Sequence, residues 1–455
     1  MKTSTATAAK PAAEAPVFEA GPKSKAIYDE EQKYIAPGVQ SIGLFSQIAM
    51  ERGEGVYFID EDGRRYMDFY AGVGVASLGH AHPRYVKVMQ DQVAKINVGS
   101  FVTKHRLNFV KTLAGVTPKG MTRTQLYSGG SESVEAALRL AKSHTKKTEY
   151  IGFWGGFHGK TMGVLGLLGD DFKKDLGPLL PGTYLMPYAY CYRCPFKTTH
   201  PECGLLCAEY IRDAVKYQTT HNIAAFIMEP IQGTNGNVIP PAGYVKAVMS
   251  IAHEMGALFI ADEMITGFGR TGKMFGVMHE DIVPDIITVG KGLACGMPVS
   301  GVISSDAVIN SKPFANPSGS SSSYGGNPLA AAACDATLST ILNEKLVENS
   351  AKVGAHMLER LKGMAEKFKF IGDVRGRGLM IGVEMVSDRK SKKRLDKAVS
   401  RALFDECLKR GLMSMCYSHT IRINPPLIIT KAEADKGLDI LEESFTAISK
   451  RFKLN

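Results

Sequence analysis

The sequence predicts an α/β protein in which a large domain, built on a mostly parallel sheet, carries a smaller α+β domain. The 455 residues, 44% hydrophobic and 22% charged, suit a globular chain of two or three domains. Between residues 120 and 305, short apolar runs alternate with longer amphipathic segments. After residue 328 this alternation ends, and long helical segments precede a strand pair. We interpret the change of pattern as a change of domain.

The N-terminal part of the chain has two sections. Residues 1–25 are rich in Ala, Thr, Lys and Pro and lack the apolar core of a secretory signal, so we expect a mobile arm. Without an export signal, we expect a cytoplasmic protein whose eight cysteines are reduced. In residues 26–75, the stretch VYFIDEDGRRYMDFY at 56–70 contains an Asp-Gly turn signal and predicts a hairpin. We expect this section to pack on the smaller domain.

The large domain is predicted to span residues 76–335. Continuous apolar strands that alternate with helices are typical of a parallel sheet covered on both faces. The expected strands lie at 124–128, 150–155, 224–230, 257–263, 285–292 and 299–304, and the expected helices at 133–145, 207–218 and 244–256.

The smaller domain is predicted to take residues 336–455. Its pattern mixes long helices with a few strands, which favours an α+β arrangement. The expected elements are the end of a helical stretch over 328–366, a strand pair within 370–386, a helix at 397–410, a strand within 418–429 and a last helix at 431–451.

Charge and hydropathy narrow the class of partner. The net charge of +10 suits anionic small molecules such as phosphate cofactors and carboxylate substrates. The chain has no Lys/Arg run and no basic stripe interleaved with aromatic residues, which argues against nucleic acid. No apolar run approaches the roughly 20 residues of a membrane span, which argues against a membrane.

Two charged residues stand at the ends of apolar runs. Asp262 follows the run ALFIA, and a buried carboxylate there needs a positive partner. Lys291 ends another run between Gly290 and Gly292, where desolvation would lower its pKa and make it nucleophilic toward an aldehyde. In open α/β sheets such strand ends meet at one edge, where ligands bind. These two residues are therefore the predicted catalytic pair.

Two further motifs belong to the same edge. Gly130 and Ser131 precede a helix, where backbone N–H groups can bind phosphate, although such residues are often simple caps. Phe157 and His158 follow another strand, and an aromatic side chain there can stack on a planar ring or pack in the core. Phosphate, planar ring, protonated ring nitrogen and aldehyde together predict pyridoxal phosphate as the cofactor.

Seven motifs, in the family's order, resemble the class III (subgroup II) aminotransferases of pyridoxal-phosphate fold type I. The resemblance covers about residues 40 to 450 and is closest to members that use ω-amino acids or amines with pyruvate. It implies a homodimer, or a tetramer, with each active site at a subunit interface. The motifs are VYFIDEDGRRYMDFYAGVGVASLGHAHP, SGGSESVEAALRLA, GGFHGKTMG, FIMEPIQG, ADEMITGFGRTG, ITVGKGLACGMP and YGGNPLAAAA.

The resemblance also implies roles for individual residues. Lys291 would form the Schiff base with the cofactor and move the proton, and Asp262 would face the pyridine nitrogen. The other implied cofactor contacts are Phe157 and Met264 on the two faces of the ring, His158 near the site, Gly130 and Ser131 at the phosphate, and Ser323 reaching the phosphate of the neighbouring subunit.

The substrate is predicted from four positions. Arg422 matches the arginine that binds a substrate carboxylate in the family, although an exposed arginine at a strand edge is the alternative. Thr234 stands where ornithine and 4-aminobutyrate enzymes carry a glutamate that pairs with this arginine, so Arg422 stays unmasked. Ile265 replaces a frequent glutamine, and Val73 replaces a tyrosine of ornithine enzymes. Together they favour a small ω- or β-amino acid or amine as donor, with pyruvate, glyoxylate or 2-oxoglutarate as acceptor.

Other functions stay open at this stage. A pyridoxal-phosphate-dependent lyase, racemase or decarboxylase of the same fold would carry the same lysine, aspartate and phosphate site. The loop CYRCPFKTTHPECGLLC suggests a different kind of site, because four thiolates can hold structural zinc and would make the loop an interaction module. Half-buried free thiols are the alternative. The cysteines concerned are Cys191, Cys194, Cys203 and Cys207, with His200 between them. No metal is predicted at the active site.

Overall fold

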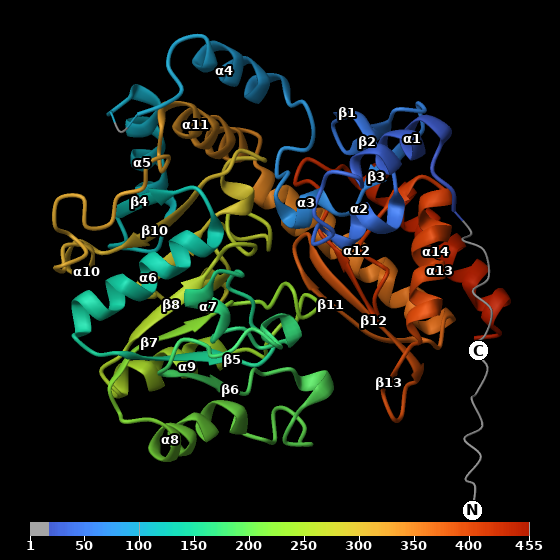
Figure 1. Ribbon diagram of the computed structural model, residues 1–455. Helices are drawn as coiled ribbons and strands as arrows, with labels where there is room; N and C mark the ends of the chain where they lie inside the picture. The colour runs from blue at the N-terminus through green and yellow to red at the C-terminus, as the bar shows by residue number, and fades with distance from the viewer. Residues whose placement is uncertain (1–17, 100, 455) are drawn as a thin grey trace, which may run out of the picture.

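The computed structural model describes residues 18–99 and 101–454, so residues 1–17 of the expected arm lie outside the described residues. Figure 1 shows a large sheet with its helices on the left and a smaller body on the right. Segments from near the two ends of the described chain, in blue and red, lie side by side in this smaller body, where β3 pairs with β14.

A seven-stranded sheet organises the large body, in the order β4-β10-β9-β8-β7-β5-β6. Strand β10 runs antiparallel to both of its neighbours, and the other pairs are parallel. Strand β8, which ends at Asp262, is therefore central. The strands are β4 (Arg123–Tyr127), β5 (Glu149–Phe153), β6 (Thr183–Met186), β7 (Ile223–Met228), β8 (Leu258–Asp262), β9 (Ile286–Val289) and β10 (Ser300–Ser304).

Both faces of this sheet are buried, as its continuous apolar strands predict. On β7, Ala225 and Ile227 join the hydrophobic cluster beneath α6, while Phe226 and Met228 join the larger cluster on the opposite face. Successive side chains of a strand point to opposite faces, so both faces must be covered. The helices of this body are α4 (Pro83–Val93), α5 (Lys104–Val116), α6 (Gly130–Thr145), α7 (Met162–Leu165), α8 (Leu206–Gln218), α9 (Tyr244–Glu254), α10 (Asp306–Ile309) and α11 (Pro328–Asn343).

The smaller body joins the two ends of the chain. Strand β3 pairs in parallel with β14, with Met67 opposite Leu412 and Asp68 opposite Met413. A second, antiparallel sheet places β12 between β11 and β15. The elements are α1 (Pro22–Glu31), α2 (Ser41–Ser46), β1 (Met50–Glu54), β2 (Tyr57–Asp60), β3 (Arg65–Asp68), α3 (Ala71–Gly74), α12 (Leu346–Lys367), β11 (Ile371–Arg377), β12 (Met380–Asp388), β13 (Lys393–Arg394), α13 (Lys397–Lys409), β14 (Leu412–Met413), β15 (Thr420–Ile423) and α14 (Lys431–Phe452).

The predicted α/β fold class is confirmed, with two details that the sequence pattern missed. Strand β6 has only one fully buried residue, so its apolar signal is weak. Strand β10 is fully buried, and its pattern gives no sign of its antiparallel direction. The predicted boundary at residue 335 falls inside α11, and the exact domain limits stay predictions. Within the described ranges, no helix is long and apolar enough to cross a membrane.

Candidate active site

A cavity of about 440 Å³ opens at the carboxyl ends of the central strands. Seven of the ten residues predicted from the sequence as site residues line it: Gly130, Ser131, Phe157, His158, Asp262, Met264 and Lys291. Ser323, Arg422 and Val73 do not line this cavity.

Asp262 is fully buried at the end of β8 and is held by three donors. Its Oδ2 lies 2.6 Å from Nδ1 of His158, and its Oδ1 accepts hydrogen bonds of 3.1 Å from the hydroxyl of Thr288 and from the N–H of Met264. If Nδ1 carries the proton that Asp262 accepts, Nε2 of His158 is an acceptor, and this buried atom has no partner in the chain. The arrangement fixes a carboxylate beside the cavity and leaves one polar atom for a ligand.

Lys291 faces the same cavity from the end of β9. Its backbone has a φ of +44°, a left-handed conformation that is uncommon for a non-glycine residue. Desolvation lowers the pKa of its ammonium group, which the charges of Asp262 and Glu229 partly oppose. A lowered pKa supplies the neutral amine that attacks a carbonyl carbon. A Cβ on the preceding Gly290 would lie 2.7 Å from Sδ of Met264, so a larger residue there would displace this flexible side chain.

The helix α6 begins at the cavity with small residues. The N–H groups of its first turn have no carbonyl partner within the helix, and the positive end of the helix dipole favours an anion there. Gly159, with a φ of +117°, lies against this turn, where a Cβ would stand 1.9 Å from Oγ of Ser131. The same Oγ accepts the N–H of Lys160 at 3.3 Å. These contacts form a cradle for a phosphate group.

Two apolar side chains provide the walls of the cavity. The backbone N–H of Phe157 donates to Glu229 at 2.9 Å, which fixes the position of this residue. Its ring packs edge-on against the ring of Phe172, with 5.7 Å between the two ring centroids. Met264 contributes a second apolar surface. Cradle, walls, amine and buried carboxylate fit the phosphate, planar ring, aldehyde and ring nitrogen of pyridoxal phosphate. The unpartnered Nε2 of His158 supports this fit.

Two other buried carboxylates lie nearby. Glu229 accepts the N–H groups of Phe157 at 2.9 Å and Gly233 at 2.8 Å, and burial raises its pKa to about 7. Glu263, directly after Asp262, faces away from it and accepts two N–H bonds of 2.8 Å, from Gly276 and Val277. Burial raises its pKa to about 7 as well. Of these two adjacent carboxylates, Asp262 therefore faces the cavity, and Glu263 binds the backbone of the loop at residues 276–277.

Arg422 approaches the site from β15, where it pairs with Gly382 of β12. Desolvation lowers the pKa of its guanidinium, while Tyr417, Tyr70 and Glu229 favour its charged form. The positive charge of Arg422 also lowers the pKa of Lys291. The two cationic groups are therefore close enough to interact electrostatically. The alternative of a solvent-exposed strand-edge arginine does not fit this desolvation.

Val73 lies in a left-handed turn beside the cavity. All four residues of α3, Ala71–Gly74, have a positive φ, between 46° and 76°. Oδ1 of Asp68 accepts the N–H groups of Tyr70 and Ala71 at 2.8 and 2.6 Å, and Oδ2 lies 2.9 Å from Nε2 of His80. Val73 packs against the core, and Val75 lines the cavity instead.

Sequence reasoning missed several residues of the site. Thr288 contacts Asp262 because β8 and β9 pair these two residues, a register that one strand alone does not reveal. Lys160 and Val75 line the cavity but carry no special spacing. Ser323 is exposed and away from the cavity of its own chain, so its expected contact with a neighbouring subunit stays a prediction.

The cysteine loop forms a separate feature. Cys191, Cys194, Cys203, Cys207 and His200 all line one cavity of about 20 Å³. In the part of the chain that the structure describes, no three His, Cys, Asp or Glu side chains are arranged to hold a metal ion. The described loop therefore offers no preformed zinc site.

Comparison with known proteins supports the reading of the cavity. The family described as aminotransferase class-III matches residues 39–445. The chain is 34% identical to a leucine/methionine racemase of Thermococcus litoralis, over 86% of this chain and 88% of the racemase. It is 33% identical to the human mitochondrial alanine–glyoxylate aminotransferase 2, over 92% and 86% of the two chains.

Solved structures agree with these relatives. A crystal structure of an amine transaminase from an uncultivated Pseudomonas species, in its form with bound pyridoxal phosphate, matches with a TM-score of 0.85 and 29% identity, over 91% of this chain and 99% of that chain. The match over nearly the whole length, together with a cavity that fits the same cofactor, shows that this chain belongs to the class-III aminotransferases, pyridoxal-phosphate enzymes of fold type I.

Proposed function

We propose that the protein transfers the amino group of a small ω- or β-amino acid or amine to an oxo-acid such as pyruvate, glyoxylate or 2-oxoglutarate. The observation that carries this proposal is the placement of Lys291, with its lowered pKa, in the same cavity as the buried Asp262. The desolvated Arg422 beyond it supplies a partner for a carboxylate.

The residues divide the work of the reaction. When bound, pyridoxal phosphate supplies an aldehyde for the amine and a ring that takes up the electron pair of a broken C–H bond. Asp262, oriented by His158, would stabilise positive charge at the ring nitrogen. Lys291, as a free amine, would take the proton from the substrate carbon that bears the amino group and would return it during the transfer. Gly130 and Ser131 would hold the phosphate, and Phe157 and Met264 would hold the ring.

The substrate end of the cavity supports a small donor. Arg422 carries a planar guanidinium group that can bind both oxygens of a carboxylate. The phenol groups of Tyr70 and Tyr417 favour the charged form of this guanidinium. Ile265 is buried and apolar, in contact with the loop at Gly233 and the turn at Gly74. An arginine that can bind one carboxylate, together with a buried apolar residue in this region, favours a short substrate with one carboxylate.

Racemisation is a second candidate, because three of the relatives are named as racemases or epimerases. They are the leucine/methionine racemase, an alanine/serine racemase of Pyrococcus horikoshii and an isoleucine 2-epimerase of Lentilactobacillus buchneri. A racemase returns the proton to the carbon from which it came, on the other face, and requires no oxo-acid.

The two reactions are separated by an acceptor-free experiment. The holoenzyme is mixed with L-alanine, β-alanine, 4-aminobutyrate or taurine, and the visible absorption of the bound cofactor is followed. In a transamination, the donor removes this absorption and pyruvate restores it. Each amino group that the donor loses then appears on one molecule of acceptor. If no donor changes the absorption, the proposed donor class is wrong. Formation of D-alanine from L-alanine without an oxo-acid, measured by chiral chromatography, would establish racemisation instead.

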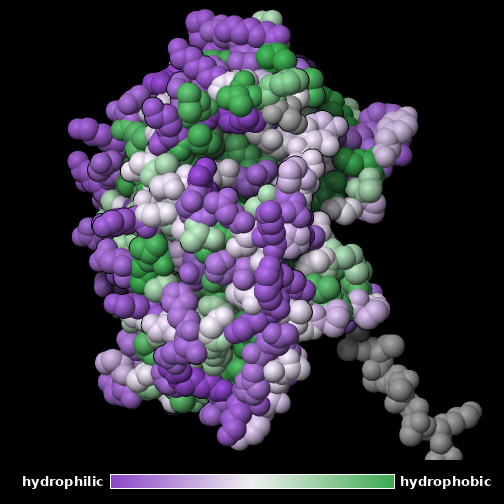
Figure 2. Space-filling model, turned by 90° about the vertical axis from the view of Figure 1, so that its left-hand side faces the viewer, coloured by the Kyte–Doolittle hydropathy of each residue, from purple (hydrophilic) through white to green (hydrophobic). Residues whose placement is uncertain are grey.

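We also propose that the enzyme works as a homodimer. Apolar side chains are exposed on and after α4, among them Phe101 at 72% and Val102 at 77%. Figure 2, which views the side that carries α4 and α5, has hydrophobic areas in its upper part. A cluster of exposed apolar side chains is typical of a subunit interface. Ser323 of one subunit would then reach the phosphate cradle of the other. The cytoplasmic location expected from the sequence remains part of this proposal.

A further inference from the structure

The proposed transamination leaves one group of nucleophilic side chains unused. Cys191, Cys194, Cys203 and Cys207 are free thiols around one small cavity, outside the active site. Cys191 is exposed and Cys194 is partly exposed. Both belong to the turn at Cys191–Arg193, which begins at one thiol and ends next to the other. A small oxidant therefore has access to this pair from solvent.

The two thiols of the turn differ in their surroundings. Burial would raise the pKa of Cys194, but the hydroxyl of Thr198, 3.6 Å from its Sγ, and the N–H groups of residues 196–198 outweigh this and lower it. Burial and the neighbouring thiols Cys194 and Cys203 raise the pKa of Cys191. The pair thus combines a partly exposed thiol whose pKa is lowered with a neighbouring thiol whose pKa is raised, and such pairs are typical of redox-sensitive cysteines.

The deeper thiol is unsuited to the same chemistry. Burial raises the pKa of Cys207 to about 12, so this group stays protonated. A protonated thiol is a poor nucleophile. Cys207 is therefore a matched control within the same loop.

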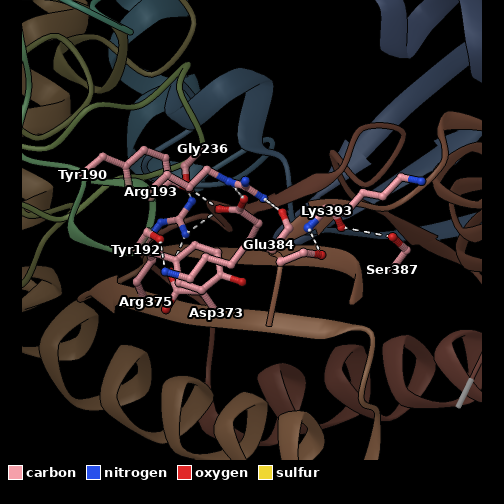
Figure 3. Close-up of polar contacts among 11 residues, drawn as sticks. Tyr190, Tyr192, Arg193, Gly236, Asp373, Arg375, Glu384, Ser387 and Lys393 are labelled. Carbon is pink, nitrogen blue, oxygen red and sulfur yellow. Dashed lines mark hydrogen bonds and ion pairs between the residues drawn. The ribbon is translucent and has the colours of Figure 1, made fainter. Parts of the chain in front are cut away.

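The two residues between these thiols, Tyr192 and Arg193, form contacts with the smaller body (Figure 3). Arg193 donates through Nε to the carboxylate of Glu384 on β12 and through Nη2 to the carbonyl of Lys392 at 2.8 Å. Nζ of Lys392 donates to the carbonyl of Tyr192 at 2.7 Å. The turn is thus attached to the smaller body from both of its central residues.

Glu384 is a sensitive point of attachment, since its side chain is only 1% exposed. Arg375 also contacts it, at 3.2 Å, and Tyr190 donates its hydroxyl to it. In the sheet, Glu384 pairs with Thr420, which precedes Arg422 by two residues. Loss of one cationic partner from a buried carboxylate is costly, so a change in the turn reaches the strand of Arg422.

We propose that Cys194 and Cys191 are a thiol–disulfide site that hydroperoxides oxidise, and that the disulfide weakens the contact between Arg193 and Glu384. The sulfur of Cys194 attacks the peroxide, so that an S–O bond forms, the O–O bond breaks and an alcohol leaves after taking a proton. Cys191 then attacks this sulfur, an S–S bond forms, and water leaves with the S–O oxygen. Two thiols lose two electrons in total, and the hydroperoxide is reduced to alcohol and water.

The first experiment maps the bond and requires no substrate. The holoenzyme is treated with hydrogen peroxide, free thiols are blocked with iodoacetamide, and peptides are identified by mass spectrometry. We expect a link between residues 191 and 194 that dithiothreitol reverses. It should persist in Cys207→Ser and disappear in Cys194→Ser. A link between Cys203 and Cys207, four alkylated cysteines after oxidation, or one equivalent of zinc protecting all four thiols would each overturn the proposal.

The second experiment measures the effect on the substrate site and rests on the proposed role of Arg422. Oxidised wild-type enzyme should show a KM for a carboxylate donor about fivefold higher or more. Arg193→Ala should show the same rise without oxidant, and Cys191→Ser should not respond to peroxide. A mapped disulfide with unchanged KM refutes the link to Glu384. Failure of every donor to react refutes the proposed transamination, while the mapped disulfide still stands.

Discussion

Asp262 owes its position to three different parts of the chain. Its partners come from the loop after β5, from β9 and from the turn that follows β8. The apolar run before Asp262 and the apolar run before Lys291 were sufficient to predict both residues at one sheet edge. Thr288 was not predictable, because its contact depends on the register between two strands far apart in the chain.

Asp262→Ala should lower kcat about 100-fold or more, because the ring nitrogen loses its fixed negative partner. Cofactor binding should fall much less, since the phosphate cradle is intact. Steady-state kinetics and absorbance titration with pyridoxal phosphate measure the two effects. Thr288→Val is the matched control and should lower kcat only about threefold to tenfold, because it removes one of three donors to the same carboxylate. A near-normal kcat in the alanine variant would show that Asp262 has another role.

Glu229 should make stability depend on pH, because burial raises its pKa from 4.5 to about 7. Between these values the folded state holds a proton that the unfolded state has released. The stability of the fold therefore falls as pH rises through this window, by up to about 3 kcal/mol for this group. Glu263, whose pKa burial also raises to about 7, contributes a similar slope, so Glu229→Gln should reduce the pH slope of the urea midpoint between pH 5 and 8 by about half. The exposed Glu202→Gln should leave the slope unchanged. Parallel slopes in wild type and Glu229→Gln would contradict the raised pKa.

At the scale of elements, helix α6 and the loop at Gly159 create the cradle together. The small residues at the start of the helix were recognisable in the sequence, whereas the close approach of Gly159 was not, since it depends on how the loop after β5 folds back. Val73 shows the same limit. Asp68 imposes a left-handed turn that places Val75 in the cavity wall, and spacing along the chain does not reveal it.

Gly159→Ala should weaken pyridoxal-phosphate binding at least tenfold, because its Cβ would stand 1.9 Å from Oγ of Ser131. Gly120→Ala is the matched control. Gly120 also has a positive φ, of 86°, but nothing lies within 4 Å of its added Cβ. Both variants should lose stability through backbone strain, whereas only Gly159→Ala should lose cofactor affinity, measured by fluorescence titration. Equal cofactor affinity in the two variants would show that Gly159 does not contribute to phosphate binding.

At the scale of the whole molecule, the sequence predicts the fold well, whereas the homodimer stays a prediction. Alternating apolar runs and amphipathic segments indicate a covered sheet, because both properties are local. The proposed subunit contact uses the exposed apolar surface around Phe101, and a sequence pattern does not distinguish such a surface from a loop.

Val102→Asp should convert the proposed dimer into a chain of 49.3 kDa, as measured by sedimentation velocity. A charge in an apolar interface is left without a partner, which costs several kcal/mol. Tyr217→Asp is the control, because Tyr217 is equally exposed, at 77%, on α8. Activity should fall with the dimer, since Ser323 would no longer reach its partner. If Val102→Asp has the same mass as the wild-type protein, the surface around Val102 is not the subunit interface.

The pairing of β3 with β14 has a consequence for synthesis on the ribosome. Val75 reaches the cavity through the turn that Asp68 holds, and Asp68 itself lies opposite Met413. The seven strands of the large sheet are complete once residue 304 has been made, more than 100 residues before β14. A nascent chain can therefore finish the sheet that bears Asp262 and Lys291 while β3 still lacks its partner strand. The two bodies of the enzyme are thus completed at different times during synthesis.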